Sequence, residues 1–286
     1  MRLEDYPTQP HFTATVLSTQ RITDPAADVE VRELVLEVEQ HKFDFEVGQC
    51  IGVLTEGPVE FGDAVHHRLY SVADTPAPAD AGQPEITIVV RRCSYIDDYS
   101  GETFDGVSSN YICDRAKGDQ LTITGPYGAP FNVPDDKTAN LIMIGLGTGI
   151  APFRGLLKRI YREIGGWDGK VRLLYGAHSG LELLYMNTTR DDVANYLGEK
   201  NFEAIKALSP RPDWADPIAW DDAIADRADE IRQLVLNDNT FIYIAGLSQI
   251  QDPLHEMFSN MFDKADEWDS LKASLVAEHR WVELLY

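Results

Sequence analysis

His67-Arg68-Leu69-Tyr70-Ser71 is the stretch around which the chain is organised, and a glycine-rich stretch further along, Gly145-Leu146-Gly147-Thr148-Gly149-Ile150-Ala151-Pro152-Phe153-Arg154, is its counterpart. On a β-strand, Arg68 and Tyr70 point to the same side, while Leu69 points to the other side, towards a core. A guanidinium fork beside an aromatic ring suits a ligand with a phosphate at one end and a planar heterocycle at the other. An ordinary strand edge is the alternative interpretation, so the prediction depends on the motifs that follow.

The length and composition indicate a two-domain protein of a reducing compartment. The chain has 286 residues, of which 44% are hydrophobic, enough for two buried cores. Its three cysteines, Cys50, Cys93 and Cys113, are scattered, so they predict neither a disulfide framework nor a metal or iron–sulfur site. The first residues, 1–7, lack an apolar signal core, and no apolar run approaches the length of a membrane span. We therefore expect a soluble, cytoplasmic protein.

The strong negative charge excludes two classes of partner. A formal net charge of −22 argues against nucleic acids and anionic membranes. An acidic partner protein would need a local basic patch to dock on, and the alternative is that these cations are solvated surface positions. The candidates are Arg91-Arg92, Arg115, Lys117, Lys158-Arg159 and Arg162.

The first half of the chain has the pattern of a small antiparallel β-barrel. From residue 11 to about residue 134, short β-branched and aromatic runs are separated by turn residues such as Gly48 and Lys117-Gly118-Asp119. Six runs with this spacing predict a barrel of about six strands. The expected strands are His11–Ile22, Val31–Val38, Cys50–Leu54, Arg68–Ala73, Glu85–Arg92 and Gln120–Thr124.

The second half has the pattern of a doubly wound α/β domain. Asn140–Gly145 is a continuous apolar run, as expected of a buried parallel strand, and a glycine-rich turn and a helix over Ile150–Ile164 follow it. A strand, a glycine turn and a helix N-terminus together predict a nucleotide cradle, although the spacing Gly-x-Gly-x-Gly differs from the common dinucleotide fingerprint. Further strands are expected at Val171–Tyr175 and Thr240–Ala245. We predict domains at residues 1–134 and 135–286.

The ordered set of motifs resembles the plant-type ferredoxin–NADP(+) reductases, which are two-domain FAD enzymes. The resemblance extends over nearly the whole chain. Its motifs are Gly48-Gln49-Cys50-Ile51-Gly52-Val53, Arg68–Ser71, Gly106-Val107-Ser108-Ser109-Asn110-Tyr111, Gly125-Pro126, Gly147–Phe153, Asp238-Asn239-Thr240-Phe241, Gly246-Leu247 and Tyr286.

The resemblance implies a Greek-key barrel over residues 1–134 with FAD along one side. Arg68 and the segment Gly106, Val107, Ser108 and Ser109 would hold the FAD pyrophosphate, with serine at 108 where the family usually has cysteine. Tyr70 and Ser71 would face the isoalloxazine, and Tyr95 would stack on adenine. Half-buried packing is the alternative for Tyr95, and a plain N-cap of a helix over Ser109–Ala116 is the alternative for Ser108 or Ser109. Leu69, Val90 and Arg91 complete the expected FAD-binding set.

The same resemblance implies NADP(H) binding by residues 135–286. Thr148 would touch both nucleotides, with Ala177, His178, Gly246 and Leu247 on neighbouring loops at the C-terminal ends of strands. His178 stands where the family commonly has proline, so we interpret it as a neighbour of the cofactor and not as an acid or base. The ring of Tyr286 would lie over the flavin and give way to nicotinamide. A C-terminal aromatic anchored in a core is the alternative.

Three departures from the family pattern bear on the chemistry. Ala245 replaces the usual cysteine before Gly246-Leu247, and Glu283 stands three residues before Tyr286 where the family has glutamate two before it. A shift of one residue turns a strand side chain to the opposite face, so we interpret Glu283 as a solvated carboxylate and not as a proton relay.

The third departure concerns the 2′-phosphate of NADP(H). Ser209 matches the family's serine, but Pro210 replaces the usual arginine and Arg211 follows one place later. Carboxylates in the following segment would repel a phosphate dianion. We favour NADP(H) on Ser209 and Arg211, with NAD(H) as the alternative. The carboxylates are Asp213, Asp216, Asp221 and Asp222.

The predicted function is hydride transfer between NADP(H) and FAD, with single electrons passed to or from a ferredoxin or flavodoxin. Ser71 would hydrogen-bond near flavin N5, and Tyr286 would gate the nicotinamide face. One alternative is an NADH-dependent reductase component that feeds an oxygenase or another iron–sulfur acceptor. Another is a non-catalytic flavin-binding redox sensor, which Ala245 and Glu283 make conceivable. We expect a monomer and no metal site.

Overall fold

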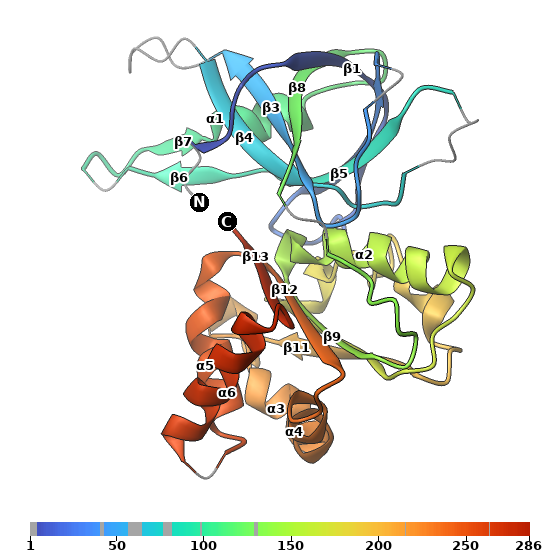
Figure 1. The fold of residues 1–286 in the computed structure, drawn as a ribbon. Helices are drawn as coiled ribbons and strands as arrows, with labels where there is room; N and C mark the ends of the chain where they lie inside the picture. Colours follow the sequence, from blue (N-terminus) through green and yellow to red (C-terminus); the bar gives the residue numbers. More distant parts are fainter. Residues whose placement is uncertain are drawn as a thin grey trace. The chain divides into compact units, whose positions relative to one another are not determined.

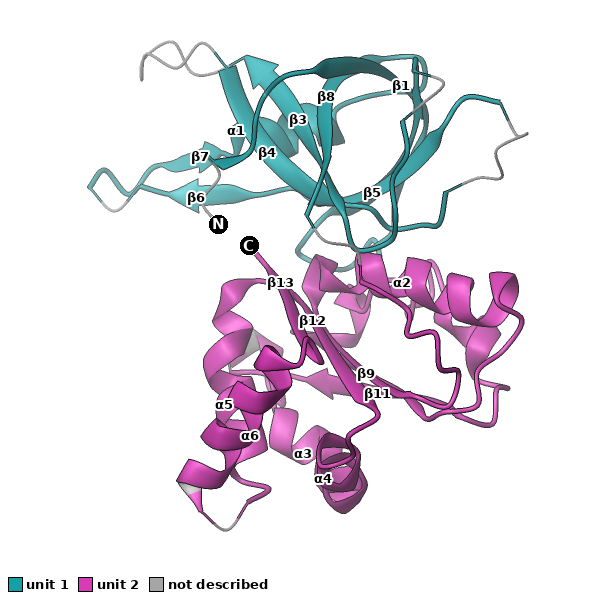
Figure 2. Ribbon diagram, viewed as in Figure 1, with its two compact units in different colours: residues 1–130 teal, residues 131–286 magenta. Residues whose placement is uncertain are grey.

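The computed structural model describes residues 5–40, 43–56, 65–76, 82–97, 99–128, 131–214, 216–262 and 264–286. The chain divides into two compact units, residues 1–130 and 131–286 (Figure 2). This division falls a few residues before the expected boundary at residue 134. Figure 1 follows the chain through both units.

Unit 1 is a closed antiparallel barrel. Its six-stranded sheet has the order β4-β3-β8-β1-β2-β5. An antiparallel bridge between Val72, just after β4, and Ile88 in β5 joins the first strand of this order to the last, and the Ala73 N–H donates to the Thr87 carbonyl at 2.8 Å. The predicted barrel is thus confirmed. The strands are β1 (His11–Arg21), β2 (Val31–Val38), β3 (Cys50–Glu56), β4 (Val65–Ser71), β5 (Glu85–Arg91) and β8 (Gln120–Tyr127).

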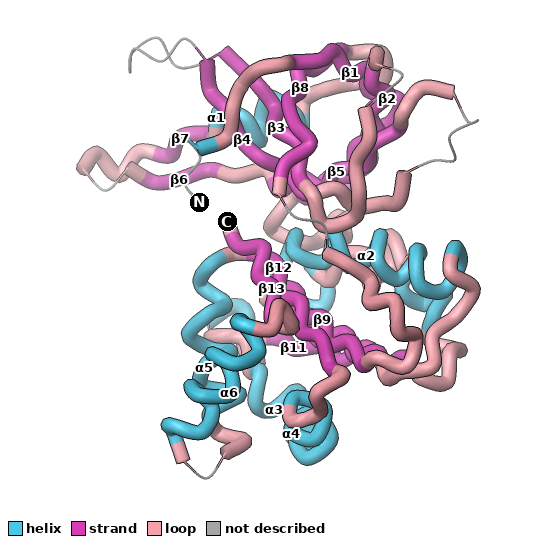
Figure 3. Tube along the Cα trace, in the orientation of Figure 1, coloured by secondary structure: helices cyan, strands magenta, loops and turns pink. Residues whose placement is uncertain are grey.

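The barrel closes because alternate strand residues turn inwards. In β2, Leu34, Leu36 and Val38 are buried, and they pack with inward residues of the other strands. The short helix α1 (Val107–Cys113) adds Ile112 and Cys113 to this core. Unit 1 contains no other α-helix among its described residues (Figure 3).

A small hairpin that the sequence analysis did not predict extends from the barrel. It pairs β6 (Ser94–Ile96) with β7 (Thr103–Asp105). Both strands are three residues long and exposed, so they show too little alternation to be recognised from sequence.

Unit 2 is a parallel sheet with helices on both faces, as predicted. The five strands have the order β11-β10-β9-β12-β13, and every pairing is parallel. Helix α2 lies on one face, and α3 to α6 cover the other (Figures 1 and 3). The strands are β9 (Asn140–Leu146), β10 (Val171–Ala177), β11 (Phe202–Leu208), β12 (Thr240–Gly246) and β13 (Trp281–Leu285); the helices are α2 (Ile150–Lys158), α3 (Trp220–Ile224), α4 (Ala228–Val235), α5 (Gln251–Ser259) and α6 (Ala265–Ala277).

Further elements differ from the sequence prediction, in position or because they were not predicted. Strands β11 and β13 were not predicted because they are the two edges of the sheet, where Glu203, Lys206 and Glu283 interrupt the apolar run. Helix α2 ends at Lys158 and continues as one π-helical segment, Arg159–Glu163, instead of as a regular helix to residue 164. Helix α1 begins at Val107 and ends at Cys113, two to three residues earlier than expected.

Candidate nucleotide-binding sites

Strand β4 places the predicted FAD residues of unit 1 on two faces. Arg68 is exposed, and Leu69 on the opposite face is half-buried. Tyr70 packs against the barrel core, so the expectation that only Leu69 turns towards a core is wrong for Tyr70. The reason is that Tyr70 pairs with Ile51, whose side chain lies in that core, and paired residues share a face. Ser71 is half-buried at the end of β4.

The hydroxyl of Tyr70 links β4 to helix α1. It donates to Ser108 Oγ at 3.1 Å, and burial raises the pKa of Tyr70 to about 12. The phenol is therefore neutral at physiological pH and remains a donor. Arg68 and the start of α1 are thus held on neighbouring elements.

The start of α1 is built around a glycine. Gly106 is the N-cap, and no side chain caps the helix, so the predicted N-cap role of Ser108 or Ser109 is wrong. Both serines lie inside the helix and are buried, and Ser109 Oγ accepts the Cys93 N–H at 3.2 Å. A Cβ at Gly106 would come within 2.8 Å of Ser109 Oγ. Backbone N–H groups at this helix start therefore provide the donors that an anion requires.

Tyr95 offers one face of its ring to solvent. It lies in β6, stacks on Phe104 at a centroid distance of 5.6 Å, and is 55% exposed. Val90 lies in the barrel core, which leaves only its backbone for a ligand, while the neighbouring Arg91 is exposed. Arg92 from the proposed basic patch is occupied by Glu30 and Asp114, each at 2.8 Å.

The glycine turn of unit 2 brings the ends of β9 and β12 together. A Cβ at Gly149 would lie 2.0 Å from the carbonyl oxygen of Ala245, and one at Gly246 would lie 2.7 Å from that of Leu146. Gly147 and Gly246 have φ of 56° and 137°, a region that favours glycine. Only glycine at positions 149 and 246 allows the ends of β9 and β12 to approach this closely. The turn leads directly into α2.

Thr148 and Tyr286 meet at this turn. Their hydroxyl oxygens are 2.5 Å apart, and Tyr286 is 52% exposed, so it is not anchored in a core. The Tyr286 N–H donates to the Gly246 carbonyl, and the Tyr286 carbonyl accepts the Ser248 N–H, both at 3.1 Å. These contacts bring together three predicted site residues, Thr148, Gly246 and Tyr286. A fourth, Leu247, directly follows β12.

A second group of predicted residues lies at the ends of β10 and β11. Ala177 is buried at the end of β10, His178 after it is exposed, and the Ser209 N–H donates to the His178 carbonyl at 3.3 Å. Ser209 is 6% exposed, and its Oγ has no hydrogen-bond partner among the described residues. Arg211 Nε lies 2.7 Å from Asp216 Oδ2.

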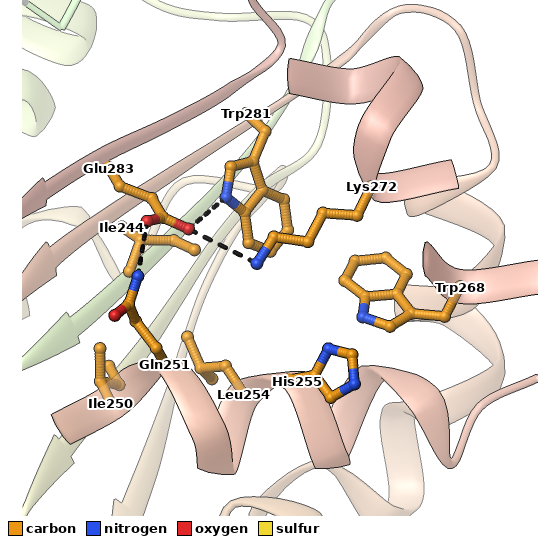
Figure 4. Close-up of a pocket in the computed structure, with 9 residues that line it drawn as sticks. All are labelled: Ile244, Ile250, Gln251, Leu254, His255, Trp268, Lys272, Trp281 and Glu283. Carbon is orange, nitrogen blue, oxygen red and sulfur yellow. Dashed lines mark hydrogen bonds and ion pairs between the residues drawn. The ribbon is translucent and has the colours of Figure 1, made fainter. Parts of the chain in front are cut away.

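Glu283 is exposed, in agreement with its interpretation as a solvated carboxylate, and it also contacts three residues. It accepts hydrogen bonds from Trp281 Nε1 at 2.6 Å and from Gln251 Nε2 at 3.1 Å, and Lys272 Nζ lies 3.7 Å away (Figure 4). Trp281 and Glu283 share one face of β13, where α5 and α6 pack. The alternation of an edge strand predicts this shared face, but the contacts with the helices are long-range and leave no local pattern.

Two features of unit 2 were not predicted as paired or packed groups. Asp216 was recognised only as one of several carboxylates, and its ion pair with Arg211 was not predicted. The same guanidinium lies 5.3 Å from the exposed ring of Trp214. The close approach of Gly149 to Ala245 is a contact between residues far apart in sequence. Within the described ranges, no cluster of potential metal ligands occurs, and no helix is long and apolar enough to cross a membrane.

A six-stranded antiparallel barrel followed by a parallel sheet with a glycine turn defines a two-unit dinucleotide-binding protein. A family profile described as an oxidoreductase NAD-binding domain matches residues 143–255. Ferredoxin–NADP reductase from Picosynechococcus is 31% identical over 94% of this chain and 68% of its own length. Leaf isozyme 1 of chloroplastic ferredoxin–NADP reductase from Arabidopsis thaliana is 30% identical over 94% of this chain and 76% of its own.

A solved structure of Plasmodium falciparum ferredoxin–NADP+ reductase with 2′P-AMP has the same fold, with a TM-score of 0.73, 18% identity and 98% coverage of both chains. The chain belongs to the ferredoxin–NADP reductase family, which confirms the resemblance stated from its motifs.

Proposed function

We propose that this protein is an FAD-dependent oxidoreductase that transfers hydride between NADP(H) and flavin and exchanges single electrons with a ferredoxin or flavodoxin. Membership of the ferredoxin–NADP reductase family is the observation that carries this proposal. It is an enzyme whose two units each serve one nucleotide. Unit 1 serves FAD and unit 2 serves NADP(H).

The residues of unit 1 fit FAD. An exposed guanidinium at Arg68 and the uncapped helix start at Gly106 supply donors for a pyrophosphate, and the half-exposed ring of Tyr95 supplies a stacking surface for adenine. Val107, Ser108 and Ser109 contribute backbone N–H groups. Tyr70 and Ser71 would face the isoalloxazine, with Leu69, Val90 and Arg91 beside the cofactor.

The residues of unit 2 fit a nicotinamide dinucleotide. At Gly149 and Gly246 an added Cβ would collide with the carbonyl oxygens of Ala245 and Leu146, so glycine lets the ends of β9 and β12 lie close together at the proposed cradle. Thr148, Ala177, His178 and Leu247 surround it at the C-terminal ends of the strands, where ligands bind in such sheets. The buried, unpartnered hydroxyl of Ser209 and the guanidinium of Arg211 provide partners for a phosphate at the adenosine end.

The flavin supplies the hydride and one-electron chemistry, and the protein positions the reacting groups. Ser71, at the end of β4, would donate a hydrogen bond near N5. Tyr286 would cover the flavin face that nicotinamide takes, and the hydrogen bond between its hydroxyl and Thr148 holds the tyrosine side chain at the glycine turn. Glu283 has no part in proton transfer in this scheme, because its carboxylate is held by Trp281, Gln251 and Lys272.

For the partner and setting, we infer a monomer in the cytoplasm that works with an acidic carrier. The three cysteines are free, as a reducing compartment requires. Arg92 is occupied by Glu30 and Asp114 within unit 1, so it is not available to a docking patch for that carrier.

The test is an absorption spectrum of the purified protein followed by titration with each nicotinamide. We expect a yellow protein that NADPH bleaches and that added oxidised ferredoxin restores. A colourless protein unable to take up FAD would overturn the proposal. A flavin that no nicotinamide reduces would favour a redox sensor.

An NADH-dependent reductase component is the second candidate function. The ion pair of Arg211 with Asp216 favours it, because a carboxylate stands where the 2′-phosphate of NADPH would bind. Bleaching by NADH at far lower concentration than by NADPH would support this candidate.

A further inference from the structure

At the adenosine end of the proposed nicotinamide site, an arginine forms an ion pair with a carboxylate. Ser209, buried and without a partner for its hydroxyl among the described residues, follows β11, and Arg211 lies two residues further on. The Arg211 guanidinium contacts Asp216 side-on, with Nε–Oδ2 at 2.7 Å and Nη2–Oδ1 at 3.4 Å. The side chain of Asp216 is 24% exposed, and that of Arg211 is 62% exposed.

The two nicotinamide cofactors differ only in the group on one ribose carbon, which is a hydroxyl in NAD(H) and a phosphate in NADP(H). A carboxylate typically accepts a hydrogen bond from the hydroxyl, and an arginine typically binds the phosphate. This loop holds one of each type, already bonded to each other. Neither cofactor therefore meets a site prepared only for it.

We infer that Asp216 sets the choice between NADP(H) and NAD(H) by occupying Arg211. A 2′-phosphate must displace the Asp216 carboxylate from the guanidinium, and the displaced carboxylate then repels the phosphate. A 2′-hydroxyl displaces nothing, because Asp216 retains lone pairs that accept a hydrogen bond from it while the ion pair stays intact. The inference rests on the proposed function, in which Ser209 and Arg211 face the adenosine ribose.

The surroundings explain why Arg211 is in reach of either partner. Its guanidinium lies 5.3 Å from the ring centroid of Trp214, whose side chain is 74% exposed. This ring supports the guanidinium whether Asp216 is bound or released. A released Arg211 therefore stays in the loop, where the Ser209 hydroxyl provides a second partner for a phosphate.

The first experiment measures binding and does not depend on turnover. The FAD-loaded protein and its Asp216→Asn variant are titrated by calorimetry with 2′-phospho-AMP and with AMP. Asparagine keeps the shape of the side chain but removes the charge, so we expect 2′-phospho-AMP to bind about 10-fold tighter, which corresponds to about 1.4 kcal/mol. AMP should bind no more tightly than before.

Asp222→Asn is the matched control. It removes the same formal charge from an exposed position at the start of α3. If Asp222→Asn tightens 2′-phospho-AMP as much as Asp216→Asn does, the effect is general charge reduction and the inference is overturned. An unchanged affinity in Asp216→Asn overturns it as well.

The second experiment measures the ratio of kcat/KM for NADPH to kcat/KM for NADH, with ferricyanide as the electron acceptor. Asp216→Asn should raise this ratio about 10-fold through a lower KM for NADPH. Arg211→Gln should lower it, and in the Arg211→Gln background Asp216→Asn should lose most of its effect. If neither nucleotide reduces the wild-type flavin, the proposed function fails; an unchanged ratio in an active enzyme overturns only the role of Asp216.

Discussion

The proposed site of the barrel depends mainly on side chains, and the proposed site of the parallel sheet depends mainly on closely packed backbone. In unit 1, the side chains proposed to face the cofactor are those of Arg68, Tyr70, Ser71 and Tyr95, and backbone N–H groups are proposed only at the start of α1. In unit 2, the central part is backbone, because at Gly149 and Gly246 there is no room for a Cβ.

This difference predicts two kinds of tolerance to mutation. A side-chain site loses one contact at a time, so single substitutions in unit 1 should change the chemistry while FAD remains bound. In a site formed by closely packed backbone, the Cβ of any residue that replaces glycine would collide with a main-chain carbonyl. Substitutions in the glycine turn should therefore affect folding and binding together.

The largest expected effect is that of Gly149→Ala. Its Cβ would lie 2.0 Å from the Ala245 carbonyl oxygen, so β9 and β12 would have to separate. We expect a loss of stability of roughly 3 kcal/mol or more, together with loss of NADP(H) binding. Thermal unfolding and nucleotide titration measure the two effects.

Two other glycines separate collision from strain. At Gly147 an added Cβ meets no atom within 4 Å, but φ is 56°, so Gly147→Ala should be intermediate. At Gly180 an added Cβ also meets nothing within 4 Å, and no positive φ is present, so Gly180→Ala should be close to neutral. Equal stability of the Gly149 and Gly180 variants would contradict the comparison of the two units.

An intermediate effect is expected for Ser71→Ala in unit 1. Loss of its hydrogen bond near flavin N5 should slow reduction by NADPH by about 10-fold, with FAD still bound and the unfolding temperature little changed. Stopped-flow absorbance measures the rate. Ser18→Ala, on the exposed side of β1, is the control. Full activity of Ser71→Ala would remove this serine from the mechanism, and release of FAD would show that unit 1 is less tolerant than predicted.

The smallest effect concerns side-chain charges that support the sheet of unit 2 away from its glycine turn. A hydrogen bond from Arg172 and, secondarily, one from Lys170 lower the pKa of Glu230 from 4.5 to about 2. Since the folded-state pKa is the lower one, the charged form stabilises the fold above about pH 4.5, and this contribution is lost as the pH falls towards 2.

Glu230→Gln should therefore unfold about 1 kcal/mol more easily at pH 7, and its difference from the wild type should shrink below pH 4.5. Urea denaturation at a series of pH values measures this difference. Glu256→Gln, at an exposed position of α5, is the control. A difference that persists undiminished at the lowest pH would mean that the ion pair is not its cause.

Local patterns predicted the elements whose residues contact their neighbours in a regular way. Val31–Val38 was predicted with its observed bounds, and the apolar run beginning at Asn140 identified β9, because alternation and continuous burial are visible within a few residues. The motifs of the turn at Gly147 and of the strand at Arg68 indicated the family and the proposed site together.

The remaining features depend on partners far away in sequence. Edge strand β13 has a solvated side, and the role of Glu283 depends on Gln251 and Lys272 from two helices. The proposed role of Asp216 depends on its ion pair with Arg211. The composition of this segment does not show that pair. In each case, the chemical group could be identified from the local sequence, but its role depends on a tertiary contact.

The closure of the barrel gives a direct way to observe flavin release. The bridge between Val72 and Ile88 starts one residue after Ser71, and the amide hydrogen of Ala73 is bonded across it to Thr87. Opening this seam would move the Ser71 hydroxyl away from any ring it contacts. Deuterium uptake at Ala73 therefore reports how often unit 1 loosens, and a bound isoalloxazine should slow that uptake more than uptake elsewhere in the barrel.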